Sequence, residues 1–151
     1  MVKANKKLVI LVLLVAMVIG SVLASGYVHI KTSTAKPQTQ TQIIEDITSE
    51  EAYTLIQENK GNLNFVILDV RTPEEFVRDH IGNAINLDYY SETFKGDLNR
   101  LDKNKTYLIY CQIGGRSKMV LGIVKELGFR EAYNMLGGIT QWKAKEMPTT
   151  K

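Results

Sequence analysis

The stretch Tyr110-Cys111-Gln112-Ile113-Gly114-Gly115-Arg116-Ser117 joins an apolar, strand-like run, 106–110, to a helix-like run, 117–127. The chain's one cysteine therefore stands where a strand ends and a short loop turns into a helix. Such a loop favours a thiolate, because its backbone N–H groups converge and the helix macrodipole adds positive potential. Two glycines let the backbone turn inward, and an arginine adds a full charge. The stretch thus indicates a reactive thiol at the end of a strand.

From this stretch we predict that Cys111 is a nucleophile; the alternative is an inert, buried core thiol. Arg116 is expected to contact an anion, because a guanidinium group matches planar and tetrahedral oxyanions. Ser117 is expected to be the N-cap of the following helix, and its hydroxyl could also serve the site. The predicted substrate-binding residues are Gln112, Ile113, Gly114, Gly115, Arg116 and Ser117.

Six other side chains are considered for roles near this loop or in the core. An acid inside an apolar strand must be paired or partly solvated, so Asp69 and Arg71 are interpreted as a structural charge network rather than as catalytic groups. His80 could act as a general base, but we favour a structural role. Trp142 is expected to pack in the core. The pair Tyr89-Tyr90 could line the mouth of the site, but we do not assign it that role.

Hydrophobic periodicity predicts alternating strands and helices. The strands are expected at 43–47, 65–70, 84–87, 106–110 and 132–134. Two capping boxes, 48–51 and 72–75, start the first two helices, and further helices are expected at 91–101, 117–127 and 138–145. The fourth helix is predicted to bury one apolar face made of Met119, Val120, Ile123, Val124 and Leu127. The alternation predicts an α/β fold whose parallel sheet is covered by helices on both faces.

Composition narrows the functional classes. The chain has 151 residues and a net charge of +3, but residues from 43 onward contain 14 basic and 16 acidic side chains, a net of −2. A nearly neutral domain gives no indication of nucleic-acid binding. A single cysteine excludes an intramolecular disulfide, and with His29 and His80 as the only histidines no metal-ligand spacing is present. We therefore expect no metal site.

The N-terminal segment is predicted to direct the domain out of the cytoplasm. Three lysines precede an uncharged, largely apolar stretch, 8–28, which resembles a secretory signal cleaved after Ala24 and also approaches the about 20 residues that span a bilayer. Cleaved signal and retained membrane anchor both remain open. The predicted domains are a signal or anchor at 1–24, a flexible linker at 25–42 and a globular domain at 43–151.

Four motifs together resemble the rhodanese-like family, over about 43–142. They are the cysteine loop, 68–76 (LDVRTPEEF), 79–86 (DHIGNAIN) and 137–142 (GGITQW). The resemblance implies a three-layer α/β fold and transfer of a sulfane sulfur through a Cys111 persulfide, a reaction that needs no metal or organic cofactor. The donor would be a small sulfur-donor anion such as thiosulfate, or a persulfide, and the acceptor a thiol or cyanide. The segment 79–84 lacks the proline that the family often has there, which affects a turn and not the nucleophile.

Other functions share this layout. One is a persulfide carrier without turnover, which the uncharged Gln112 and Ile113 favour. Another is a cysteine phosphatase or arsenate reductase, but four residues separate Cys111 from Arg116 and the related phosphatases have five, so their cradle is wider. The chain contains one such unit, and it is expected to act as a monomer or a homodimer.

Overall fold

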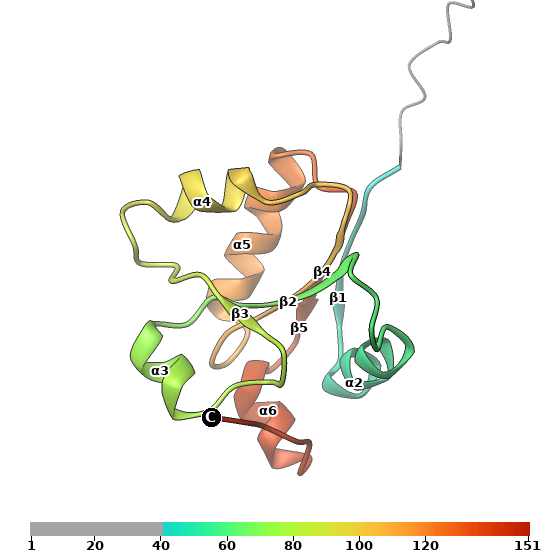
Figure 1. The fold of residues 1–151 in the computed structure, drawn as a ribbon, viewed down its shortest axis with the longest axis vertical. Helices are drawn as coiled ribbons and strands as arrows, with labels where there is room; N and C mark the ends of the chain where they lie inside the picture. Colours follow the sequence, from blue (N-terminus) through green and yellow to red (C-terminus); the bar gives the residue numbers. More distant parts are fainter. Residues whose placement is uncertain (1–40) are drawn as a thin grey trace, which may run out of the picture. The chain divides into compact units, whose positions relative to one another are not determined.

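The apolar runs 65–69 and 106–110 form neighbouring strands inside a parallel sheet. The computed structural model describes residues 41–151. Its strands are β1 (Ile43–Ile47), β2 (Phe65–Asp69), β3 (Ile85–Asn86), β4 (Thr106–Tyr110) and β5 (Glu131–Met135). Its helices are α2 (Ser49–Glu58), α3 (Pro73–Arg78), α4 (Phe94–Arg100), α5 (Gly115–Glu126) and α6 (Gly138–Ala144) (Figure 1). The sheet order is β1-β5-β4-β2-β3, with every pair parallel.

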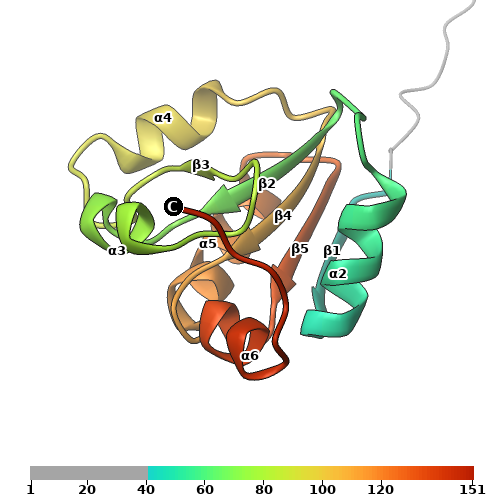
Figure 2. The same ribbon diagram turned by 60° about the horizontal axis from the view of Figure 1, so that its bottom comes forward.

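Helices cover both faces of this sheet, as the alternation predicted (Figures 1 and 2). On one face α4 and α5 bury Phe94, Leu98, Val120 and Val124 against the strands. On the other face α2 and α6 bury Ala52, Ile139 and Trp142. Trp142 is in the core as expected, and its indole N–H donates to the carbonyl of Pro148 at 2.9 Å. The central strands are buried from both sides, which explains why their sequences are nearly continuous apolar runs.

Local signals in the sequence set the starts of α2 and α3. Thr48 and Thr72 are their N-caps, and each forms a reciprocal capping box with the glutamate three residues later. Pro73 occupies the first turn of α3, where its missing N–H costs nothing. Both capping boxes are therefore confirmed, and the second one places Glu75 at the carboxyl end of β2.

The prediction for α5 was wrong in two respects. The helix starts at Gly115, because Gly114 adopts φ +95° and turns the chain into the helix before Ser117. Its buried stripe is Ser117, Val120, Leu121 and Val124, the i, i+3, i+4 and i+7 positions of one face. Met119 falls outside that stripe and is exposed, and the Tyr89 hydroxyl lies 3.6 Å from its sulfur.

The N-terminal predictions fall almost wholly outside the described residues. These are the signal or anchor, 1–24, and the linker up to residue 40. The end of the linker is described: the Gln42 amide donates to the carbonyls of Phe129, at 2.7 Å, and Lys125, at 3.1 Å. Gln42 is thus held by the domain. Between residues 41 and 151 the helices are too short and too polar to cross a bilayer.

Candidate active site

The loop between β4 and α5 places Cys111 at the carboxyl end of a central strand, where open parallel sheets bind ligands. Its side chain is 1% exposed. The N–H of Gly114 donates to Sγ at 3.2 Å, and the Ser117 hydroxyl lies 3.5 Å from the same sulfur. The sulfur therefore sits inside the turn of the loop, with donors directed at it from the loop and from the first turn of α5.

These donors set the protonation of the thiol. Burial raises the pKa of Cys111, but hydrogen bonds from the Ser117 hydroxyl and from the backbone N–H groups of Ser117, Ile113 and Gly114 act in the opposite direction. Together they outweigh burial, so the pKa lies below the ordinary value. The structure thus favours the thiolate, which is the nucleophilic form of cysteine.

Ser117 is not the N-cap that the sequence predicted. Gly114 is the N-cap residue, and Ser117 is fully buried in the first turn of α5. Its hydroxyl has two acceptors, the Cys111 sulfur and the Gly114 carbonyl, the latter at 3.2 Å. Because the helix starts earlier than predicted, Ser117 lies within its first turn and its hydroxyl contacts the thiol.

The start of α6 is hydrogen-bonded to the cysteine loop and holds it in place. The N–H groups of Ile139 and Thr140 donate to the carbonyls of Cys111 and Gln112 at 2.9 and 3.0 Å. The Gln112 amide also donates to the Thr140 hydroxyl at 2.9 Å. Gly138 makes this approach possible, because a Cβ there would lie 2.3 Å from the Cys111 carbonyl oxygen. The motif 137–142 therefore fixes the loop that carries the nucleophile.

Arg116 closes the loop, as the sequence placed it, but its guanidinium group is bound by Glu75 of α3. The two nitrogens donate to the two carboxylate oxygens at 2.7 and 2.8 Å. The ring of Tyr90 lies beside the same group, with its centroid 5.6 Å from the guanidinium carbon. Glu75 was not predicted to be part of the site. Its place in a capping box was the one signal in the sequence, and its other partner, Arg116, lies 41 residues away in the chain.

Asp69 and Arg71 form a buried ion pair, with Nη2 and Oδ2 at 2.8 Å. Arg71 also contacts Asp79 at 3.3 Å and the side-chain oxygen of Gln112 at 3.5 Å. The network therefore contacts the cysteine loop at Gln112, the residue that follows Cys111. His80 lies at its edge, with Nδ1 3.0 Å from the carbonyl oxygen of Phe76 and its ring stacked on the Phe76 ring.

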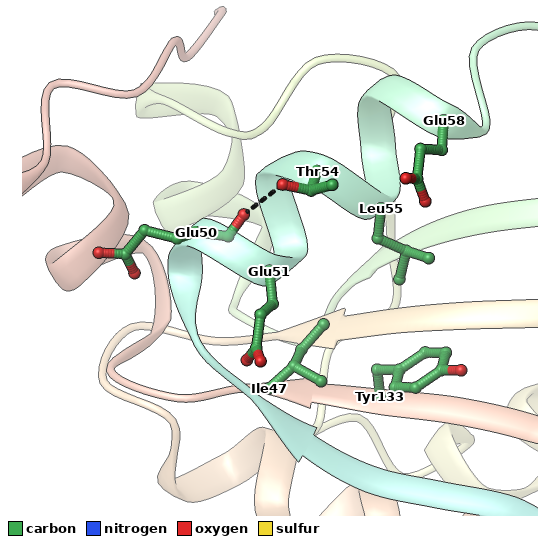
Figure 3. A pocket seen from close by; sticks show the side chains of 7 residues that line it. All are labelled: Ile47, Glu50, Glu51, Thr54, Leu55, Glu58 and Tyr133. Carbon is green, nitrogen blue, oxygen red and sulfur yellow. Dashed lines mark hydrogen bonds between the residues drawn. The ribbon is translucent and has the colours of Figure 1, made fainter.

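A hollow beside α2 and β1 is lined by no residue of the cysteine loop; Figure 3 shows its lining side chains. Ile47, Leu55 and Tyr133 form its apolar floor, and Glu50, Glu51, Thr54 and Glu58 line its edge. Glu51 is held in the capping box of α2, and Glu50 pairs with Lys145. The hollow has no nucleophile, and within residues 41–151 no cluster of three metal-ligating side chains occurs.

Comparisons with known proteins agree with this geometry. A model of the Rhodanese-like domain family matches residues 48–145. Thiosulfate sulfurtransferase GlpE of Coxiella burnetii is 34% identical over 105 residues, which cover 66% of this chain and 88% of the relative. The Arabidopsis thaliana protein HIGH ARSENIC CONTENT 1, mitochondrial, is 30% identical, over 70% of this chain and 67% of its own.

Solved structures share the fold. The crystal structure of a rhodanese-like domain protein from Staphylococcus aureus is 34% identical, with a TM-score of 0.56, and covers 65% of this chain and 90% of its own. A rhodanese-related protein from Thermoplasma volcanium is 25% identical, with a TM-score of 0.60, and covers 70% of this chain and 97% of its own.

Proposed function

This chain belongs to the rhodanese-like domain family, and we propose that it is a sulfurtransferase in which Cys111 carries the transferred sulfur. The observation that carries the proposal is the convergence of hydrogen-bond donors on one buried sulfur. These donors stabilise negative charge, and such charge is present both on the thiolate and on the persulfide that it would form. The relative named thiosulfate sulfurtransferase supports the same class of reaction.

The reaction would proceed in two steps. The Cys111 thiolate attacks the outer sulfur of the donor, a sulfur–sulfur bond forms on Cys111, and the donor's own sulfur–sulfur bond breaks. Thiosulfate would leave as sulfite, and an organic persulfide would leave as a thiol. A cyanide ion or a thiolate then attacks the outer sulfur and restores the Cys111 thiolate, so ping-pong kinetics are expected.

The residues around Cys111 would have separate roles in these steps. The N–H of Gly114 and the Ser117 hydroxyl stabilise charge on the sulfur. The amides of Ile113, Gly115 and Arg116 belong to the same loop and would surround the outer sulfur. Gln112 is tied to α6 and holds the loop in place. The proposed reaction requires no cofactor.

A persulfide carrier without turnover is the second candidate. The near-complete burial of the sulfur favours it, because a carrier must protect its persulfide from solvent. Phosphatase or arsenate reductase activity is disfavoured, since four residues between Cys111 and Arg116 make a narrower cradle than the related phosphatases have.

Mass spectrometry of the full chain after incubation with a sulfur donor tests these candidates. A sulfurtransferase gains the mass of one sulfur on Cys111 and loses it to cyanide with turnover, whereas Cys111→Ser does neither. A carrier gains the sulfur without turnover. A thiol that takes up no sulfur from thiosulfate or from an organic persulfide would refute both, and phosphate-ester hydrolysis faster than sulfur transfer would point to the phosphatase.

We also propose that the domain works outside the cytoplasm, either released or held at the membrane by segment 1–24. Lysines followed by an uncharged apolar stretch support this proposal. Cell fractionation tests it: the protein is expected in the extracytoplasmic or membrane fraction, and an intact chain in the cytosol would contradict it.

A further inference from the structure

The charge of Arg116 is already neutralised before any substrate arrives. Its guanidinium group and the Glu75 carboxylate form two parallel hydrogen bonds, and their side chains are 15% and 23% exposed. The same contact holds the pKa of Glu75 down at about 2, so this carboxylate is ionised at any physiological pH. A bidentate, largely buried pair of this kind is a persistent contact and not a loose surface pair.

Two further cations of the described domain have acidic partners, one in a buried network and one in an exposed pair. Arg71 lies between two carboxylates, Asp69 and Asp79. Lys118, in the first turns of α5, pairs with Asp46 of β1. Each of these cations of the described domain thus has an acidic partner. The positive potential that remains at the sulfur comes from backbone N–H groups and from the N-terminus of α5, which together amount to about half a charge.

Two classes of sulfur donor differ in how much positive charge they need. Thiosulfate is a dianion, and while its outer sulfur enters the loop its sulfonate group must stay at the mouth, where Arg116 is located. An organic persulfide carries at most one negative charge, on the sulfur that the loop itself would receive. Its organic part places no further charge at the mouth.

We propose that Glu75 selects the donor class, so that this site accepts sulfur from organic persulfides in preference to thiosulfate. This inference rests on the proposed sulfur transfer and narrows it. In the favoured step the Cys111 thiolate attacks the outer sulfur of R–S–SH, a new sulfur–sulfur bond forms on Cys111, and the bond between the two sulfurs of the donor breaks. The proton of the outer sulfur ends on the departing thiol, which leaves Cys111–S–S⁻, and no oxidant or reductant is consumed.

The side chains at the mouth fit an organic donor. Ile113, in the loop itself, is 70% exposed, and Tyr90, whose ring lies beside the Arg116 guanidinium group, is 67% exposed. Both present apolar surface that an organic group can cover, while neither offers charge to a sulfonate. Because Tyr90 packs against the paired guanidinium group, the pair is also shielded from solvent on that side.

The experiment compares kcat/KM of the full chain for two donors, thiosulfate and the persulfide of N-acetylcysteine methyl ester, whose organic part is uncharged. The wild type is expected to prefer the persulfide at least tenfold. Glu75→Gln keeps an acceptor for the capping box of α3 and releases Arg116. It should raise the ratio of thiosulfate to persulfide kcat/KM at least tenfold, and added salt should reduce this gain.

Two further variants separate charge from structure. In Glu75→Gln/Arg116→Gln the ratio should return to the wild-type value, because the released cation is gone. Asp97→Asn breaks the exposed pair with Arg100 on α4 and should leave the ratio unchanged. A wild type that uses thiosulfate as well as the persulfide, or a Glu75→Gln ratio equal to wild type, overturns the inference while sulfur transfer stands. Failure of both donors to load Cys111 overturns sulfur transfer itself.

Discussion

Replacing Ser117 with alanine should raise the pKa of Cys111 and decrease its thiolate fraction. The serine hydroxyl lies 3.5 Å from the sulfur and is the strongest of the groups that lower the thiol pKa. Alanine fits the same space and leaves the backbone N–H groups of the loop in place. The substitution thus removes one hydrogen-bond donor and keeps the loop.

The magnitude follows from the geometry. A hydrogen bond to a charged group contributes about 1.5–3 kcal/mol. The lower end applies here, because the contact is long and the same hydroxyl also has the Gly114 carbonyl as an acceptor at 3.2 Å. About 1.5 kcal/mol corresponds to roughly a tenfold change in an equilibrium constant, here the ionisation of the thiol. Since the folded-state pKa is lowered by this contact, its loss decreases the thiolate fraction at any pH below the new pKa.

The assay follows thiolate ultraviolet absorbance and the rate of alkylation by iodoacetamide as functions of pH. Both curves should shift to higher pH in Ser117→Ala, and alkylation well below the pKa should slow about tenfold. Ser49→Ala is the matched control, because Ser49 is also a buried serine at the start of a helix but its hydroxyl has no hydrogen-bond partner in the described domain. An unchanged or lowered thiol pKa in Ser117→Ala, or an equal shift in Ser49→Ala, would refute the reasoning.

Three further substitutions test the supports of the site. Asp69→Asn leaves Arg71 buried without its main counter-charge, so chemical denaturation should show a loss of about 3–5 kcal/mol. Gly138→Ala places a Cβ against the Cys111 carbonyl at a φ of +55°, so sulfur loading should be lost together with at least about 2 kcal/mol of stability. The contact with Arg116 lowers the Glu75 pKa from 4.5 to about 2, so it stabilises the fold above about pH 4.5 and this stabilisation disappears as pH falls toward 2. The free energy of unfolding of the wild type should therefore fall by up to about 3 kcal/mol more than that of Glu75→Gln over this pH range.

Much of the fold could be predicted because local and global signals agree. Continuous apolar runs, 65–70 and 106–110, can only be buried from both sides, and that requires a parallel sheet between helix layers. The capping boxes at 48–51 and 72–75 depend on residues within one turn, so the sequence displays them directly. The position of Cys111 at a strand end follows from the same local pattern.

The errors have one physical origin, which is a backbone angle that periodicity does not report. Gly114 in a left-handed conformation starts α5 early and changes which residues face the sheet. Ser117 thereby becomes a donor to the thiol and not a cap, and Leu121 replaces Met119 in the core. A glycine pair permits such an angle but does not say which of the two residues adopts it.

The partner of Arg116 could not be predicted for a different reason, because it depends on how two segments meet in space. Glu75 accepts the Thr72 N–H at 2.9 Å through the same oxygen, Oε2, that accepts from Arg116 at 2.7 Å. One carboxylate therefore fixes the start of α3 and neutralises the cation that closes the cysteine loop. Glutamine can keep the first contact through its amide oxygen but cannot accept both N–H groups of a guanidinium group. This difference makes Glu75→Gln a change in the charge at the site rather than in the helix, so its effect on donor preference can be separated from any effect on folding.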